Sequence, residues 1–204
     1  MPTSAALVLG SSQRLESVDV DRLEAAHLSL ERRRSGGGAV LVAPGQQVWL
    51  DAFLPRGDPL LEEDLARSSW WLGELWAQAL VASGADHATL AVHRGAIVHS
   101  PWSRSLCFAG LGPGEVTLSG RKLVGISQRR GRLGAWFHST APVGFDPDLL
   151  AGLVPLDALA RRALAGHLAG QVATLPVVAK DLEERLRRTL GGGDVGRVTH
   201  AATA

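Results

Sequence analysis

The chain has 204 residues, 46% of them hydrophobic, and its 21 basic and 20 acidic residues leave a formal net charge of +1. This length and composition are sufficient for one or two domains with a buried core, and we expect one. The near balance of charge excludes a general attraction to nucleic acid or to a membrane surface. Any charge recognition must therefore come from local patches such as Arg32–Arg34.

The start of the chain does not have the pattern of a secretory signal, because Ala5–Leu9 is a short apolar run without a preceding basic region. The apolar stretch around Trp70 is interrupted by Glu74 and Gln78, which is not typical of a membrane span. The single cysteine, Cys107, cannot form an internal disulfide and is typical of a reducing compartment. We therefore expect a soluble, cytoplasmic protein.

Hydrophobic spacing and turn residues predict the elements of the first half of the chain. The expected strands are Ala5–Leu9, Leu28–Arg33, Ala39–Val42 and Gln47–Phe53, the last two forming a pair across Pro44-Gly45. The expected helices are Asp19–Ala26, with Ser17 or Asp19 as its cap, and Asp64–Ala82, which Gly84 would end. The tryptophans of the second helix are typical of a core-facing surface.

The second half of the chain continues with short strands and then changes to helices. The expected strands are Ala88–His93, Ala96–His99, Glu115–Leu118, Arg121–Gln128 and Gly134–Ser139, with a Ser119-Gly120 turn joining the third and fourth. The expected helices are Pro155–Ala169 and Val177–Leu190.

This order of elements predicts an α+β fold in which a mixed, mainly antiparallel sheet with flanking helices carries the site. We expect a single domain over residues 1–190. The run of three glycines that begins at Gly191 indicates a flexible tail over residues 191–204.

A second run of three glycines, Gly36, Gly37 and Gly38, follows two arginines and Ser35. Glycine has no Cβ, so its backbone can approach a ligand closely and direct several NH groups toward it. A phosphate, a carboxylate or an acyl chain could lie against such a loop. The spacing matches neither the Walker nor the Rossmann pattern, and glycine runs are more often plain flexible loops.

Lys122 and Cys107 are candidate chemical groups. Alternation along the expected strand places Lys122 on the same face as Val124 and Ile126, which is unusual for a primary amine. The ordinary interpretation is a lysine that protects an edge strand, and a lone cysteine is most often a small buried residue. In the functional interpretation, Lys122 lowers the pKa of Cys107 so that a nucleophilic thiolate is available.

The histidines do not indicate a metal site. His87, His93, His99 and His138 lack a recognisable ligand spacing. The sequence also contains neither a serine-hydrolase elbow nor a zinc cluster. We therefore expect no metal.

Two segments together resemble the motifs of lipoate-protein ligases. Arg32-Arg33-x-Ser35-Gly36-Gly37-Gly38-Ala39-Val40 is similar to their glycine-loop motif, and Gly120-Arg121-Lys122-x-x-Gly125-x-Ser127-Gln128-x-Arg130 is similar to their lysine motif. Their order and separation also fit, over about residues 5–146. The chain thus resembles the biotin/lipoate protein ligase superfamily, and this resemblance implies a class II synthetase-like domain.

Within that superfamily, Cys107-Phe108-Ala109 ahead of the lysine motif is similar to the ligase-like octanoyltransferases. The resemblance implies that Cys107 accepts an octanoyl or lipoyl group from acyl carrier protein as a thioester, without a cofactor, and passes it to the lysine of a lipoyl domain. Lys122 would polarise the acyl carbonyl and favour the thiolate.

The resemblance also implies roles in binding the acyl group. Gly36 to Gly38 would shape the acyl channel, Arg33 and Ser35 would hold the loop, and Gly125 and Ser127 belong to the lysine motif. His138 stands where the family has a histidine before glycine, although Ser139 follows it here.

Two alternatives remain open. In an ATP-dependent lipoate-protein ligase that uses ATP and Mg, Lys122 and the glycine loop would bind an acyl-adenylate and Cys107 would be incidental. The third possibility is a binding module for an acyl ligand or carrier protein. The family pattern continues with His-Asp and then Gly-Asn, where this chain has Val42-Ala43 and Gly45-Gln46. These departures are compatible with an accessory subunit, a changed substrate or lost activity.

Overall fold

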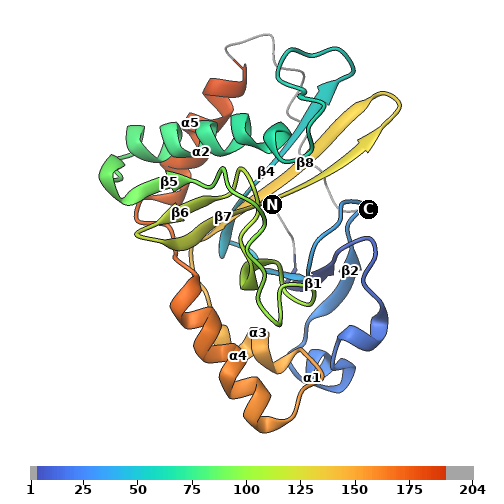
Figure 1. Cartoon of the computed structure of the whole chain (residues 1–204). Helices are drawn as coiled ribbons and strands as arrows, with labels where there is room; N and C mark the ends of the chain where they lie inside the picture. The colour runs from blue at the N-terminus through green and yellow to red at the C-terminus, as the bar shows by residue number, and fades with distance from the viewer. Residues whose placement is uncertain (1–3, 192–204) are drawn as a thin grey trace.

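A computed structural model describes residues 4–191, which form two separate sheets (Figure 1). The smaller sheet has the strand order β2-β1-β3 and the larger has the order β4-β8-β7-β6-β5. The strands are β1 (Ala6–Leu9), β2 (Ser29–Arg32), β3 (Val40–Val42), β4 (Gln47–Pro55), β5 (Leu90–Val92), β6 (Val116–Leu118), β7 (Arg121–Gly131) and β8 (Gly134–Pro142).

Five α-helices and four short 3₁₀ turns complete the described chain. The helices are α1 (Val20–Ala25), α2 (Trp70–Ala82), α3 (Pro147–Gly152), α4 (Ala158–Gln171) and α5 (Ala179–Gly191), and the 3₁₀ turns are η1 (Leu15–Ser17), η2 (Arg67–Ser69), η3 (His87–Thr89) and η4 (Cys107–Ala109). The helices α1, α3 and α4 lie at the end of the molecule away from the larger sheet (Figure 1). The side chains of Asp19, Asp146 and Asp157 accept backbone NH groups at the starts of α1, α3 and α4. These caps satisfy NH groups that have no partner within the helix.

The larger sheet is built from neighbouring antiparallel strands. The β6–β7 hairpin turns at Ser119 and Gly120, which both have positive φ, as the sequence predicts. From Gly125 onward β7 pairs with β8, and β4 joins the far side of β8. The α+β prediction with a mainly antiparallel sheet is therefore confirmed.

The predicted pairing of Ala39–Val42 with Gln47–Phe53 is wrong. The first segment pairs with β1 in the smaller sheet, whereas the second pairs with β8 in the larger one. The short connection across Pro44 and Gly45 therefore carries the chain from one sheet to the other instead of closing a hairpin.

Three further predictions need correction. Residues 96–99 form no strand, because Val98 makes only an isolated bridge to Leu111. The helix expected from Asp64 begins at Trp70 after a 3₁₀ turn. The sequence prediction also omitted α3, a six-residue helix. The tail expected over residues 191–204 lies, beyond Gly191, outside the described residues.

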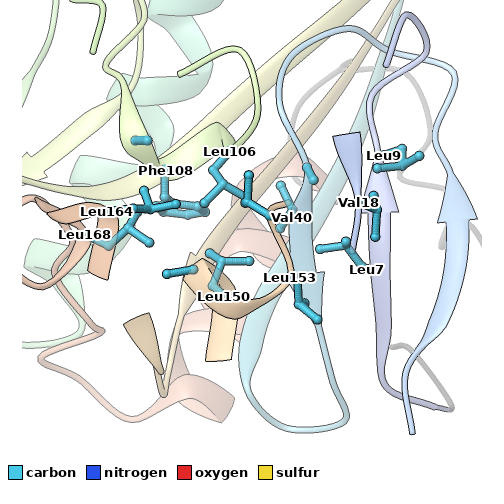
Figure 2. Packing of buried hydrophobic residues seen from close by; sticks show 14 of the residues in the cluster. Leu7, Leu9, Val18, Val40, Leu106, Phe108, Leu150, Leu153, Leu164 and Leu168 are labelled. Carbon is cyan, nitrogen blue, oxygen red and sulfur yellow. The ribbon is translucent and has the colours of Figure 1, made fainter. Parts of the chain in front are cut away.

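Each sheet has its own hydrophobic cluster. The β1–β3 sheet packs with α1, α3, α4 and the turn at Leu106 and Phe108, and Figure 2 shows these two side chains among those of the cluster. The other cluster lies between the larger sheet and the helices α2 and α5, around the fully buried Trp76 and Phe137. The tryptophan-rich helix thus contributes to a core through Trp76. Within residues 4–191, no helix has the length and apolar character needed to cross a membrane.

Candidate active site

Arg33 holds the glycine loop from inside. Its side chain is 9% exposed, and Nη2 donates to the carbonyls of Gly36 and Gly38, both at 2.8 Å. Nη1 donates to the Val8 carbonyl of β1 at 3.2 Å. Burial lowers the pKa of Arg33, while the nearby Cys107 opposes that shift. The guanidinium thus fixes the loop against the first strand.

Gly38 lies directly against the backbone that leads to Cys107. A Cβ at Gly38 would lie 2.5 Å from the Leu106 carbonyl carbon and 2.7 Å from the Cys107 nitrogen. The Cys107 NH donates to the Ala39 carbonyl at 3.0 Å. A residue with a side chain would force these two segments apart, so the third glycine of the motif is required by contact with the cysteine segment.

Ser35 connects the loop to the larger sheet. It is fully buried, and its Oγ lies 2.9 Å from the Oγ of Ser127 on β7. Two hydroxyls can satisfy one another in this way because each is both donor and acceptor. Residues that are 92 positions apart in the chain therefore meet at one end of the site.

A β-bulge sets the direction of Lys122. The register between β6 and β7 shifts, so that Val116 faces Val124 while Thr117 faces Lys122, and Leu123 is the extra residue. An extra residue reverses the alternation of side chains beyond it. Val124 and Ile126 pack in the cluster under α2 and α5, whereas Lys122 reaches the turn at Cys107. The predicted shared face is therefore wrong, and β7 is an interior strand rather than an edge.

The Lys122 ammonium is buried and fully hydrogen-bonded. Nζ lies 2.7 Å from the Cys107 carbonyl, 3.0 Å from the Gly110 carbonyl and 2.7 Å from Glu115 Oε2. It also lies 4.0 Å from Cys107 Sγ and 5.1 Å from the centre of the Phe108 ring. A charged amine is thus held within reach of the chain's one thiol.

Glu115 is the partner that makes this burial possible. It is 3% exposed, and besides Lys122 it accepts the NH groups of Gly112 at 2.7 Å and Ile126 at 2.9 Å. Burial by itself lowers the pKa of Lys122, but the charges of Cys107 and Glu115 outweigh it and leave that pKa above its ordinary value. Lys122 is therefore a cation at neutral pH and cannot serve as a base there.

His138 forms a separate group with two residues of β4. Its Nδ1 lies 2.6 Å from Oδ1 of the buried Asp51, and the Trp49 indole NH donates to the same oxygen at 2.8 Å. The carboxylate fixes the orientation of the imidazole. His138 also faces Ser127 across the β7–β8 ladder, which places this group on the strand next to the loop contact.

The structure brings most of the predicted site residues together. Arg33, Ser35 and Gly36 to Gly38 form the loop, and Gly38 contacts the backbone at Cys107. A Cβ at Gly125 would lie 3.4 Å from Phe108 and 3.5 Å from Lys122 Cε. His138 contacts neither Cys107 nor Lys122 through a hydrogen bond of the described residues.

Sequence reasoning assigned no role to Glu115 or Asp51. Glu115 follows the turn at Gly112 and Gly114, and no local pattern distinguishes it from a solvated carboxylate. The sequence does mark Asp51 in one way, because this acidic residue lies between Leu50 and Ala52 in an otherwise apolar strand. A carboxylate in such a buried strand requires a hydrogen-bond or ion-pair partner. Among residues 4–191, no three His, Cys, Asp or Glu side chains are grouped to hold a metal ion.

The sequence of this chain is similar to those of proteins of known family. The family model described as the lipoyl protein ligase A/B catalytic domain matches residues 2–184. Octanoyltransferase LipM of Clostridioides difficile (strain 630) is 26% identical over 151 residues, which are 74% of this chain and 54% of that protein. The chain thus spans about half the length of this curated relative.

Solved structures are similar in fold. A bi-partite lipoate protein ligase from Thermoplasma acidophilum, studied with its E2 lipoyl domain, aligns with a TM-score of 0.66 and 20% identity over 93% of this chain and 67% of its own. A lipoate-protein ligase A bound with ATP aligns with a TM-score of 0.57 and 17% identity over 93% and 68%. These similarities confirm the expected class II synthetase-like fold.

Proposed function

The chain belongs to the lipoyl protein ligase A/B catalytic domain family, and from this premise we propose that it is an acyltransferase of protein lipoylation. It transfers an octanoyl or lipoyl group to the acceptor lysine of a lipoyl domain through a thioester on Cys107. The similarity to an octanoyltransferase and the lipoyl domain studied with one structural relative support this substrate class.

The observation that carries the proposal is the distance of 4.0 Å between Lys122 Nζ and Cys107 Sγ. It places a fixed ammonium beside the one side chain of the site that can form a thioester. A ligase that proceeds through an acyl-adenylate has no need of a thiol at this position, so the pair favours the transferase.

The reaction consists of two acyl transfers. In the first, the Cys107 thiolate attacks the donor's thioester carbonyl, a bond from carbon to Sγ forms, and the donor thiolate leaves and takes up the proton that Cys107 lost. In the second, the neutral amine of the acceptor lysine attacks the new thioester. An amide bond forms, the bond to Sγ breaks, and the amine proton passes to solvent while the thiolate is restored.

Lys122 acts through its charge. Its three NH donors are taken by the Cys107 and Gly110 carbonyls and by Glu115, so the ammonium is held in place before substrate arrives. The developing oxyanion of each tetrahedral intermediate is stabilised by this fixed charge. To donate a hydrogen bond to the acyl oxygen, Lys122 must give up one of its three present acceptors. Its contact with the Gly110 carbonyl is the longest of the three, so this is the one that we expect it to give up.

Intact-mass measurement after incubation with octanoyl acyl carrier protein tests the proposal. We expect one octanoyl adduct that hydroxylamine removes and that a lipoyl domain accepts. Because Cys107 is the one cysteine of the chain, a thioester can form nowhere else, and Cys107→Ala should abolish the adduct and the transfer.

A parallel incubation with octanoate or lipoate, ATP and Mg distinguishes the alternatives. Modification of the lipoyl domain that needs ATP and is unchanged in Cys107→Ala would contradict the transferase and establish the ligase. Binding of the donor without any transfer in either incubation would instead establish a binding module or a chain that needs an accessory subunit.

A further inference from the structure

A surface pocket rich in arginine lies beside the glycine loop. Its volume is about 550 Å³, and its lining includes Ser11, Arg32, Arg33, Arg34, Gly36 and Arg129. Arg33 is buried, whereas Arg32, Arg34 and Arg129 are exposed. Arginines from two segments that are far apart in the sequence therefore line this pocket. The guanidinium groups of Arg32 and Arg33 donate to backbone carbonyls, whereas Arg34 and Arg129 have no such contact among the described residues.

The positive charge of this pocket has no acidic counterpart in its wall. Among the described residues, no Asp or Glu lines it; Gln128 is the remaining lining residue. Arg33 Nε is a buried donor without a hydrogen-bond partner among the described residues. Such donors are uncommon in native structures, and an acceptor such as an anion oxygen would satisfy this one. The pocket has the composition of an anion site.

The pocket is next to the reacting groups without containing them. Gly36 lines the pocket, and Gly38, two residues further, packs against Cys107. Two residues span at most about 7 Å. Cys107 and Lys122 themselves do not line the pocket. An anion bound there would thus lie beside the glycine loop, apart from the groups that react.

We propose that the arginine pocket binds the phosphate of the acyl donor's pantetheine arm. This assignment rests on the proposed transferase function. In the thioester of acyl carrier protein a long flexible chain separates the phosphodiester from the sulfur, so the phosphate binds at a site that does not contain the thiol, as in this pocket. In an acyl-adenylate the phosphate is bonded to the reacting carbonyl, so it would lie at Cys107 and Lys122 instead. Arginine is suited to phosphate because its planar fork donates two parallel hydrogen bonds.

The test compares two small donors that differ only in phosphate, octanoyl-phosphopantetheine and octanoyl-pantetheine. In the double variant Arg34→Gln/Arg129→Gln, the ratio of KM for the first to KM for the second should rise about tenfold or more, the factor that corresponds to one lost charge-assisted hydrogen bond. Arg162→Gln, an exposed arginine on α4, is the matched control and should not change that ratio.

Calorimetry with the Cys107→Ala variant measures binding without turnover, so it remains informative if the transferase proposal fails. Phosphopantetheine should bind, and Arg34→Gln/Arg129→Gln should weaken it about tenfold. An unchanged affinity for phosphopantetheine together with an unchanged KM ratio would overturn the proposal. So would a double variant that weakens binding of octanoyl acyl carrier protein alone, which would indicate that the arginines dock an acidic protein surface. Weaker binding of AMP with unchanged binding of phosphopantetheine would also overturn it and would identify a nucleotide site.

Discussion

At the scale of single residues, the site depends on a buried ion pair. Lys122 and Glu115 are 4% and 3% exposed, and each would be strongly disfavoured in the interior as an isolated charge. Their 2.7 Å contact, together with four backbone partners, compensates for the loss of water. Removing one partner leaves the other charge buried alone, which costs more than the pair contributes.

Glu115→Gln should therefore lower the free energy of unfolding by about 3 to 5 kcal/mol. The reason is the unpaired Lys122 ammonium, and chemical denaturation followed by fluorescence measures the effect. Adding Lys122→Met to Glu115→Gln should recover part of the loss, because the buried charge is then gone. Glu74→Gln, which removes one side of the exposed pair with Arg94, should cost less than about 1 kcal/mol. Equal losses at Glu74 and Glu115 would contradict this account.

How much of the site the sequence predicts differs from residue to residue. The two motifs identify Lys122 and the glycine loop, because glycines and basic residues at fixed spacing are visible locally. Cys107 is found as the one cysteine of the chain, and its role comes from the similarity of its segment to octanoyltransferases. Glu115 and Asp51 could not be assigned, since their roles depend on partners from other strands. The ordinary interpretation of Lys122 as an edge lysine is wrong for the same reason, because the strand order cannot be read from one segment.

At the scale of elements, irregularities place the chemistry. The bulge at Leu123 turns Lys122 away from the helix-covered face, and the contact at Gly38 brings the glycine loop onto the Cys107 turn. Alternation predicted Lys122 on the wrong face because it assumes a regular strand. The β3–β4 pairing was also mispredicted, since a short Pro-Gly connection is equally suited to a hairpin and to a crossing between sheets.

Gly38→Ala should impair transfer more than folding. Its Cβ would meet the Leu106 and Cys107 backbone at 2.5 and 2.7 Å, so the thiol must shift. We expect kcat/KM to fall about 100-fold, as a displacement of the order of 1 Å can cost, with a loss of about 1 to 3 kcal/mol in stability.

Gly166→Ala is the matched control. A Cβ there meets nothing within 4 Å and the position lies inside α4, so this variant should gain about 0.5 to 1 kcal/mol and keep its activity. Steady-state assays and denaturation of both variants provide the comparison, and full activity in Gly38→Ala would refute the contact's role.

At the scale of the whole molecule, two hydrophobic clusters share one site. The link between them includes the bridge from Lys122 to Val172 and the Ser35–Ser127 contact. The α+β class followed from the order of elements, whereas the division into two sheets did not, because sheet membership is set by contacts distant in sequence. The single domain over residues 1–190 stays a prediction.

A single domain should unfold as one unit. Native-state hydrogen exchange should give amides of β1 and of β8 the same global free energy, and Leu164→Ala in the smaller cluster should lower both by about 2 to 5 kcal/mol. Leu133→Ala, at an 80% exposed position, should change neither by more than about 0.5 kcal/mol. A loss confined to β1 would show that the smaller cluster unfolds independently.

The sequence separations within the site also bear on the order in which it assembles. Cys107 and Lys122 are 15 residues apart, while Ser35 and Ser127 are 92 apart. Closing a short loop costs less entropy than closing a long one, so Lys122 can reach the Cys107 turn early in folding. The contact between Ser35 and Ser127, which holds the glycine loop to the larger sheet, closes a much longer loop and forms later. A newly made chain can therefore bring its thiol and ammonium together before the loop that supports them is in place.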